Sequence, residues 1–252
     1  ATATQVVTVV DNIDPTITAP AAVTVNVDAG TCSTALSNVA LGTPTTADNC
    51  SVASTTNNAP ASFPLGNTTV TWTVTDGSGN TATATQVVTV VDNIDPTITC
   101  PSDITAYSDA TTNGTTVTWA APVTSDNCSI GSVTSSFQSG TTFTLGTQSV
   151  TYTVIDGSGN SAVCTFNVTV LDTVSPVITN CPSDITQNNN TGNCNAVVVW
   201  TAPTFFDNSG SYTVVWSHNS GDVFAVGTTT VTATVTDAAG NTTVCSFDVT
   251  VE

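Results

Sequence analysis

The sequence predicts an all-β protein made of tandem immunoglobulin-like Greek-key β-sandwiches, and three observations point to that class. Thr and Val are abundant and favour strands, whereas the helix formers Lys, Arg and Met are absent. Residues 148–156 and 162–170 alternate apolar and polar side chains, with a turn-forming D-G-S-G-N cluster between them. Short motifs also recur along the chain at near-constant steps, which indicates a repeat architecture.

The recurring motifs define the modules. Residues 1–18 are identical to residues 82–99. The turn motif begins at Asp76, Asp156 and, as D-A-A-G-N, Asp237, and the motif F-x-x-G begins at Phe63, Phe143 and Phe224. About seven short strands closed by long-range pairing fit within each step, which is typical of an immunoglobulin-type sandwich. We therefore predict immunoglobulin-like modules at residues 14–93, 94–173 and 174–252.

Residues 1–13 precede these modules and consist of a further copy of a module's last strand, residues 1–10, followed by a linker. The third module keeps its own last strand at residues 245–251, so nothing inside the chain needs the extra copy. Two interpretations remain open. Residues 1–10 are either the last strand of a preceding module in a longer array, or a donor strand that completes the sheet of a neighbouring subunit.

The charge balance is one-sided, with 18 acidic residues, no Lys or Arg and a single His, for a net charge of -18. Such a polyanion has no basic surface for nucleic acid or anionic lipid, so neither partner is expected. Its carboxylates cannot form ion pairs with Lys or Arg, and each must be hydrated, hydrogen-bonded or bound to a cation. No apolar run has the length of a membrane span, so membrane insertion is not expected.

Catalytic signatures are absent, since the sequence contains no G-x-S-x-G, no phosphate-binding P-loop and no H-E-x-x-H. We therefore expect that the chain is not an enzyme and has no organic cofactor. The eight cysteines in so polar a chain indicate an oxidising compartment and hence an extracellular protein.

The order of motifs resembles the hyalin repeat, an immunoglobulin-like module of extracellular proteins. The matching residues are C-P-S-D-I-T from Cys100 and Cys181, V-x-W-x-A-P around Trp119 and Trp200, D-N-C ending at Cys50 and Cys128, and C-(T/S)-F-x-V-T-V from Cys164 and Cys245. The first module departs from the pattern because it lacks the C-P and C-x-F cysteines. The resemblance implies an adhesive or structural role without catalysis, often in long proteins of the bacterial cell surface.

Comparison of the modules with one another predicts two disulfides. The first module has Ala19 and Ala84 at the positions where the other modules have cysteines, so both cysteines are lost together. Joint loss is expected of residues that are bonded to each other. The predicted disulfides, which tie the first strand of a module to its last, are Cys100–Cys164 and Cys181–Cys245.

The other four cysteines are less regular. Cys32 and Cys50 lie in the same module, and we predict that they are bonded. Cys128 and Cys194 lack a partner within their own modules. Equivalent points in consecutive end-to-end modules lie about 40 Å apart, which disfavours an intrachain bond between these two. The hypothesis is an interchain disulfide between Cys128 and Cys194 of chains staggered by one module, and the alternative is that both remain thiols.

Aspartates gather where modules meet, in D-N-I-D-P and its weaker form D-T-V-S-P, and on the hairpin turns. Carboxylate oxygens suit Ca²⁺, which takes six to eight oxygen ligands and would stiffen a junction. The alternative is that Asp and Asn simply form turns by bonding to their own backbone. The candidate calcium ligands are Asp11, Asp14, Asp76, Asp92, Asp95, Asp156, Asp172 and Asp237.

The function predicted from the sequence is that of a structural repeat in an extracellular fibre, filament or surface stalk that assembles with copies of itself. The alternative is an adhesin segment that binds a glycan or another surface ligand through loops at the module ends. Several N-x-(S/T) sequons, for example at Asn67, Asn113 and Asn241, are consistent with surface glycosylation.

Overall fold

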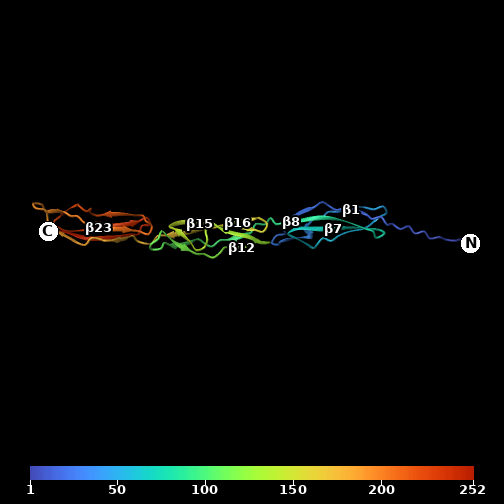
Figure 1. Cartoon of the computed structure of the whole chain (residues 1–252), viewed down its shortest axis with the longest axis horizontal. Coiled ribbons are helices and arrows are strands. Elements are labelled where there is room, and N and C mark those ends of the chain that lie inside the picture. The colour runs from blue at the N-terminus through green and yellow to red at the C-terminus, as the bar shows by residue number, and fades with distance from the viewer. The chain divides into compact units, whose positions relative to one another are not determined.

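The computed structural model describes residues 1–252, and every regular element except one short 3₁₀ turn is a β-strand (Figure 1). The chain divides into two compact units. The first comprises residues 1–99, 123–134 and 153–163, and the second comprises residues 100–122, 135–152 and 164–252. The first repeat and its linker therefore lie in the first unit, the third repeat lies in the second, and the second repeat contributes strands to both.

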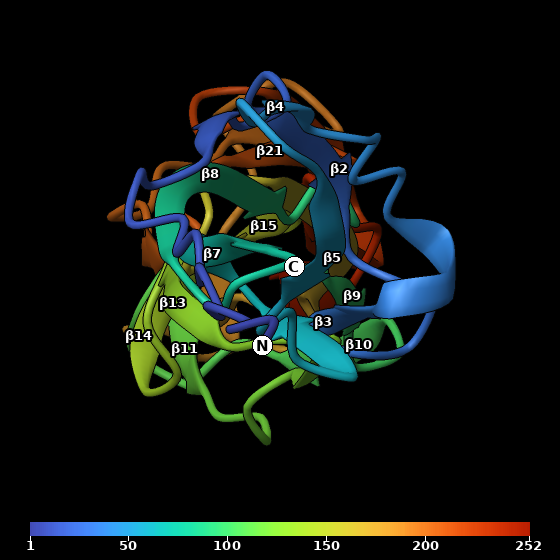
Figure 2. The same cartoon turned by 90° about the vertical axis from the view of Figure 1, so that its right-hand side faces the viewer.

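The first repeat contains eight strands and the 3₁₀ turn η1 (Leu36–Asn38), which is the broad blue ribbon in Figure 2. The strands are β1 (Thr16–Thr18), β2 (Val23–Asn26), β3 (Ser33–Ala35), β4 (Thr45–Ala47), β5 (Val52–Asn57), β6 (Ser62–Pro64), β7 (Gly66–Asp76) and β8 (Thr81–Val91). They form one four-stranded sheet in the order β2-β8-β7-β5 and two strand pairs, β1-β4 and β3-β6. Strand β2 runs parallel to β8, with Val23 opposite Val88, so an early strand and the last strand close the repeat.

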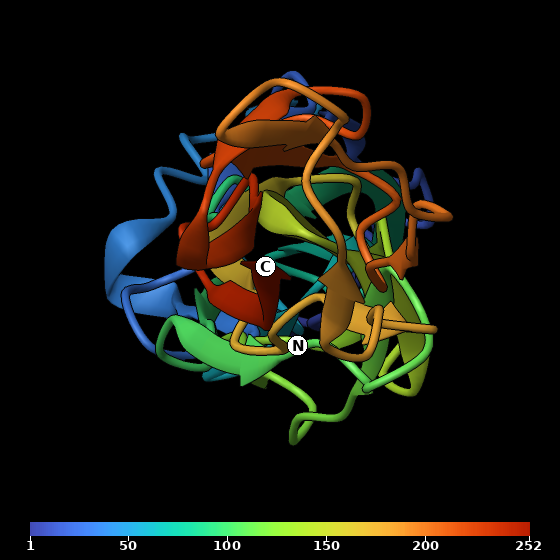
Figure 3. The same cartoon turned by 90° about the vertical axis from the view of Figure 1, so that its left-hand side faces the viewer.

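The second and third repeats have the same arrangement, with four-stranded sheets in the orders β10-β16-β15-β13 and β18-β24-β23-β21. Figure 3 shows the third repeat in orange to red. The strands of the second repeat are β9 (Thr97–Thr99), β10 (Ile104–Tyr107), β11 (Gly114–Val117), β12 (Val123–Ser125), β13 (Ile130–Ser135), β14 (Thr141–Thr144), β15 (Gly146–Asp156) and β16 (Ser161–Leu171). Those of the third are β17 (Val177–Thr179), β18 (Ile185–Gln187), β19 (Asn195–Val197), β20 (Thr204–Phe206), β21 (Tyr212–Trp216), β22 (Val223–Ala225), β23 (Gly227–Asp237) and β24 (Thr242–Val251).

Each repeat has its own hydrophobic core because its long strands bury alternate side chains. In β7, Val70, Trp72 and Val74 are buried while the Thr residues between them are half-buried. The phenylalanine of F-x-x-G is almost fully enclosed in every repeat, at Phe63, Phe143 and Phe224. Full burial of such a side chain contributes roughly 1.5–3 kcal/mol. The alternation seen in the sequence thus becomes the inner face of a sandwich.

The first repeat fills the centre of its core differently from the other two. Its buried Gln86 accepts a hydrogen bond from the Trp72 indole at 3.0 Å and donates to the carbonyl oxygens of Ala21 and Leu41 at 2.7 and 2.9 Å. Since the amide is satisfied on both sides, its burial carries little penalty. In the other repeats Phe166 and Phe247 take this position, and their rings lie 5.4 and 5.2 Å from those of Trp119 and Trp200.

Three disulfides are present, and two of them are the pairs Cys100–Cys164 and Cys181–Cys245 expected from the comparison of the modules. The third differs from the sequence prediction. Cys32 is bonded to Cys128 in the following repeat, with a Cα–Cα distance of 4.7 Å, and not to Cys50. The hypothesis of an interchain bond between Cys128 and Cys194 fails for the same reason, since Cys128 is already used. Cys50 and Cys194 are exposed thiols.

The physical reason is that Cys32 and Cys50 lie at opposite ends of their repeat. The turn that carries Cys32 is next to the end of β8, where the Val27 N–H donates to the Val91 carbonyl oxygen at 3.0 Å. The loop that carries Cys50 is next to the β7–β8 hairpin, where the Gly77 N–H donates to the Ser51 carbonyl oxygen at 3.0 Å. Where these two repeats meet, the turn that carries Cys32 in the first therefore lies against the loop that carries Cys128 in the second.

Residues 1–10 form no strand, and their valines are highly exposed, with Val9 at 91%. The same sequence at residues 82–91 forms β8, where Val88 and Val90 are enclosed. Both interpretations of residues 1–10 therefore stay open. No helical segment of the structure has the length and hydropathy needed to cross a bilayer.

Candidate metal centres

Three clusters of aspartates recur, one for each repeat, and each draws its members from the same three places. One residue comes from the linker before the repeat, one from the D-N dipeptide after the fourth strand, and one from the hairpin turn before the last strand. In each cluster one carboxylate oxygen per residue lies within 4.8 Å of the others. The clusters are Asp11, Asp48 and Asp76 (site 1), Asp92, Asp126 and Asp156 (site 2), and Asp172, Asp207 and Asp237 (site 3).

The hairpin member is fixed by its own turn. One carboxylate oxygen of Asp76 accepts the backbone N–H groups of Ser78, Gly79 and Asn80 at 2.6–2.9 Å. The other accepts the Asn80 side-chain amide at 2.7 Å. The turn needs glycine at position 79, where φ is +97°. The motif D-G-S-G-N therefore fixes the position of one carboxylate. At Asp156 the bonds come from the Ser158 and Asn160 N–H groups and the Asn160 side chain, and at Asp237, in D-A-A-G-N, from the Asn241 N–H and side chain.

The asparagine that ends this motif also holds the linker. The Asn160 side-chain amide donates to the Asp92 carbonyl oxygen at 3.2 Å while it bonds the Asp156 carboxylate. Asn80 and Asn241 make the same contacts to the linkers that contain Asp11 and Asp172. In a chain without Lys or Arg, a neutral amide thus supplies the cross-link that an ion pair would supply elsewhere.

The D-N member is positioned by a short loop that we call the D-N loop (residues 48–50, 126–128 and 207–209). One oxygen of Asp126 accepts the backbone N–H groups of Cys128 and Ser129 at 2.8 and 2.9 Å. The following Asn127 donates through its side chain to Asp92 at 3.3 Å. The D-N loop therefore orients its own aspartate and tethers the linker aspartate with one dipeptide.

Several oxygens at the clusters are buried but have no hydrogen-bond partner. The second carboxylate oxygen of the D-N aspartate is in this position at all three sites, and the linker aspartate is in this position at sites 1 and 3. At site 3, Asp207 and Asn208 are 3% and 7% exposed, so these oxygens are shut away from bulk water as well as unpaired. A buried acceptor left without a donor costs about 1–3 kcal/mol, and more for a charged group. The unpartnered oxygens are Asp11 Oδ2, Asp48 Oδ1, Asp126 Oδ1, Asn127 Oδ1, Asp172 Oδ2, Asp207 Oδ1 and Asn208 Oδ1.

Hydrogen bonding favours the ionised form of three of these carboxylates, Asp11, Asp76 and Asp156. Burial alone would raise the pKa of Asp76 and Asp156, but the bonds from Asn80 and Asn160 and from the turn N–H groups outweigh it and lower both pKa values. The pKa of Asp11 is lowered by the Ile13 N–H and the Asn49 side chain. Mutual repulsion among close carboxylates would instead favour protonation. A cation shared by the carboxylates would offset this repulsion.

The geometry fits a calcium ion. Ca²⁺ binds oxygen at about 2.3–2.6 Å, so two ligands on opposite sides of one ion lie about 4.6–5.2 Å apart. In each cluster one oxygen from each aspartate lies within 4.8 Å of the others, so a single ion could contact all three residues. Three carboxylates offer up to six oxygens, with water completing the coordination, and no softer ligand such as His is present in any cluster.

Sites 2 and 3 are each contacted by the preceding repeat. At site 2 the Asn127 side chain donates to the Thr31 carbonyl oxygen of the first repeat at 2.9 Å. At site 3 Asn208 donates to the Ser108 hydroxyl of the second repeat at 3.0 Å. Two of the three aspartates are buried at site 2 and at site 3, against one at site 1, although the linker aspartate itself is buried only at site 2. We call such a contact between successive repeats a joint.

The structure assembles six of the eight candidate ligands named from the sequence. Asp14 and Asp95, each three residues after the linker aspartate, are exposed and lie outside the clusters. The sequence reasoning missed Asp48, Asp126 and Asp207 as ligands. The signal for them was the recurrence of the dipeptide Asp-Asn once in every module.

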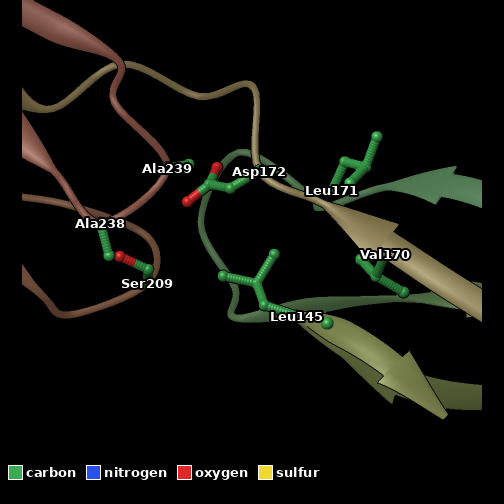
Figure 4. A pocket seen from close by; sticks show the side chains of 8 residues that line it. Leu145, Val170, Leu171, Asp172, Ser209, Ala238 and Ala239 are labelled. Atoms are coloured by element: carbon green, nitrogen blue, oxygen red, sulfur yellow. The ribbon is translucent and has the colours of Figure 1, made fainter.

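An apolar hollow of about 280 Å³ lies beside site 3. Figure 4 shows Leu145 and Val170 on one side of it and Ala238, Ala239 and Ser209 on the other. Asp172 projects from the linker into the space between these two sides, next to Leu171 (Figure 4). The hollow leaves an opening beside the linker carboxylate at this joint.

Comparison with known proteins agrees with the repeat structure. The family described as "HYR domain" matches residues 10–90, 91–170 and 171–251. Hyalin of Strongylocentrotus purpuratus is 37% identical over 262 residues, covering 99% of this chain and 22% of that protein. Hyalin of Lytechinus variegatus is 38% identical over 250 residues, covering 94% of this chain and 47% of that protein. The chain thus spans less than half the length of the curated relatives it matches.

A further relative is the sushi, von Willebrand factor type A, EGF and pentraxin domain-containing protein 1 of Rattus norvegicus, 33% identical over 69% of this chain and 5% of that protein. Among solved structures, mouse cadherin-23 EC22-24 is similar at 12% identity with a TM-score of 0.39, covering 95% of this chain and 99% of that chain. The curated relatives are animal proteins, so the bacterial source expected from the sequence is not supported. With three successive matches over residues 10–251, the chain belongs to the HYR domain family.

Proposed function

We propose that this chain is a structural segment of an extracellular fibre, filament or surface stalk whose joints are held by calcium and by disulfides. The observation that carries the proposal is the aspartate cluster at the start of every repeat. In each cluster three carboxylates converge without a basic partner and leave buried oxygens unpaired. An ion bound there would join the linker to two loops of the repeat that follows.

The role that we propose for the ion is mechanical. Apart from Cys32–Cys128, the linkers are the only covalent connections between the repeats. A linker that bends freely would not fix the orientation of one repeat relative to the next. A cation that binds the linker aspartate and the two loop aspartates would remove that freedom. The disulfides and the family membership support an extracellular location, since such bonds persist in oxidising compartments. The proposal assigns no catalytic role to the chain.

The sites should differ in affinity. Extracellular calcium modules bind with Kd values of about 10⁻⁴–10⁻³ M, and burial by a neighbouring repeat strengthens electrostatic attraction. Sites 2 and 3, in which two of the three aspartates are buried, are therefore expected to bind more tightly than site 1, in which one is buried. At a free calcium concentration of 100 times Kd, each occupied site would stabilise the folded state by about 2.7 kcal/mol.

Calorimetric titration of the calcium-free chain tests the binding. The variant Asp126→Asn removes a ligand oxygen at site 2 and should abolish one of the tight sites, with at least a tenfold loss of affinity there. The matched control is Asp95→Asn, which changes an exposed aspartate of the same linker region outside the cluster. Equal losses from both variants would mean that general negative charge, and not the cluster, attracts the ion.

Small-angle scattering with and without a chelator tests the mechanical role. We expect the scattering profile to change when calcium is removed from the parent chain, and to change less in the Asp126→Asn variant. Superimposable profiles from a chain that calorimetry shows to be loaded would refute the stiffening role while leaving the binding intact.

A further inference from the structure

The two exposed thiols, Cys50 and Cys194, are the two halves of a joint that is complete elsewhere in the chain. At the first joint, Cys128 in the D-N loop is bonded to Cys32 in a turn of the preceding repeat. The side chain of Asn127, next to Cys128, donates to the Thr31 carbonyl oxygen, next to Cys32. We call the turn at residues 28–33 and its equivalents at 109–114 and 190–195 the docking turn.

At the second joint neither of the two cysteines is present. It has the same contact, with Asn208 donating to the Thr112 carbonyl oxygen at 3.4 Å and to Ser108 at 3.0 Å. The positions of the two cysteines are taken by Asn113 in the docking turn and Ser209 in the D-N loop. A joint can therefore form without a disulfide, but a cysteine on one side is matched by a cysteine on the other.

Cys50 lies in a D-N loop that is already shaped for docking. The Cys50 and Ser51 N–H groups donate to Asp48 at 2.9 and 2.8 Å, and Asn49 donates to Asp11 at 3.3 Å, as at the completed joint. In this structure the Asn49 side chain donates to Asp11 and to the Cys50 sulfur and contacts no docking turn. The hollow beside it, about 360 Å³, is lined by Asn49, Cys50 and Ile13 among others.

The apolar residue Ile13 can also be compared with its counterpart at the first joint. Its counterpart at the first joint, Ile94, packs against the core of the preceding repeat, as does Cys128. Ile13 is 57% exposed. The face of the first repeat that carries Ile13, Asn49 and Cys50 therefore has the chemistry of a joint and is exposed in this structure.

Cys194 lies in a docking turn with the same backbone bonding as the one that carries Cys32. The Asn190 N–H donates to the Asn195 carbonyl oxygen at 2.9 Å, and the equivalent bond from Asp28 to Ser33 is 2.8 Å. The Asn193 carbonyl oxygen, at the place of Thr31, accepts the Asn189 side chain at 2.8 Å and keeps a second lone pair for another donor.

We propose that Cys50 of one copy of this chain and Cys194 of a second copy form an intermolecular disulfide equivalent to Cys32–Cys128. The Asn49 side chain of the first copy donates to the Asn193 carbonyl oxygen of the second, and Ile13 is covered. The second copy is the occupant because its third repeat carries the docking turn that this face matches. This inference rests on the proposed structural role and specifies how copies join end to end.

The bond forms by thiol–disulfide exchange with a small-molecule disulfide such as oxidised glutathione. The Cys50 thiolate attacks that disulfide and releases one small thiol, and the Cys194 thiolate then attacks the Cys50 sulfur and releases the second. Two protein thiols and one small disulfide thus become one protein disulfide and two small thiols.

The test uses two variants, Cys50→Ser and Cys194→Ser, each of which changes an exposed and unbonded residue. In a glutathione redox buffer the parent chain should form a ladder of oligomers on a non-reducing gel. Each variant alone should stay monomeric, and an equimolar mixture should give a dimer and nothing larger, at least tenfold above either variant alone. Mass spectrometry of the dimer should find a single linked peptide pair that contains Cys50 and Cys194.

Docking is separated from simple thiol exposure by two further variants in the Cys194→Ser background. Asn49→Ala and Ile13→Ser should each slow dimer formation with the Cys50→Ser chain several-fold, whereas Val215→Ser, at an exposed valine of β21, should not. Dimers that form as readily within one variant as between the two, or the absence of any dimer in the mixture, would overturn the proposal. Calcium titration of the same samples keeps this result distinct from the proposed function, because binding without dimers refutes only the intermolecular joint.

Discussion

Removal of the disulfide in the third repeat gives the sharpest test of how a repeat is stabilised. Cys181 precedes β18 and Cys245 lies in β24, so the bond ties the start of the repeat to its last strand across a sequence separation of 64. For a closed loop of that length the chain-entropy relation gives a stabilisation of about 4 kcal/mol at 25 °C. The double variant Cys181→Ala and Cys245→Ala should lose this amount.

Native-state hydrogen exchange followed by mass spectrometry can assign the loss to one repeat. A change of about 4 kcal/mol corresponds to roughly a thousandfold lower protection for amides that exchange by opening of the whole repeat. Peptides from β23 and β24 should show that loss, and peptides from β7 should not. Cys194→Ser, which removes an unbonded thiol from the same repeat, is the control. A loss of protection below tenfold in β23 and β24 would refute the reasoning from loop entropy.

Three further outcomes are expected. Phe143→Ala empties a fully enclosed position and should cost about 3–5 kcal/mol in chemical unfolding, whereas a loss below 1 kcal/mol would contradict the assigned core. Gly159→Ala places a side chain at φ +98° in open space, so backbone strain alone should cost about 1 kcal/mol or more, seen as a lower Tm. Folding lowers the pKa values of Asp76 and Asp156, so the stabilisation from these carboxylates is complete above about pH 4 and is lost as the pH falls through their folded pKa values. A Tm that stays constant in calcium-free buffer when the pH is lowered below about 4 would contradict this.

The fold could be predicted from the sequence because its causes are local. Alternation in β7 and β8 places every second side chain in the core, and D-G-S-G-N fixes the turn between them. The disulfide pairs within the second and third repeats could be inferred because a repeat without them was available for comparison. These inferences need only neighbouring residues or equivalent positions.

The joints could not be predicted in the same way because they depend on how one repeat meets the next. Cys32 was assigned to Cys50 on the assumption that bonds stay within a repeat, whereas the docking turn and the D-N loop lie at opposite ends. Asp126 was missed for a related reason. It is far in sequence from Asp92, and only the closure of the sandwich brings their carboxylates together.

The bond between Cys32 and Cys128 has a consequence under tension. A chain pulled from its two ends would carry the force across this bond, which shortcuts a sequence separation of 96 residues. Unfolding of the first repeat would then release none of that intervening contour, which amounts to roughly 320–350 Å of extended chain. Reduction of the bond would allow this length of chain to extend under force. The redox state of the surroundings would thus set how far the segment can stretch before it resists.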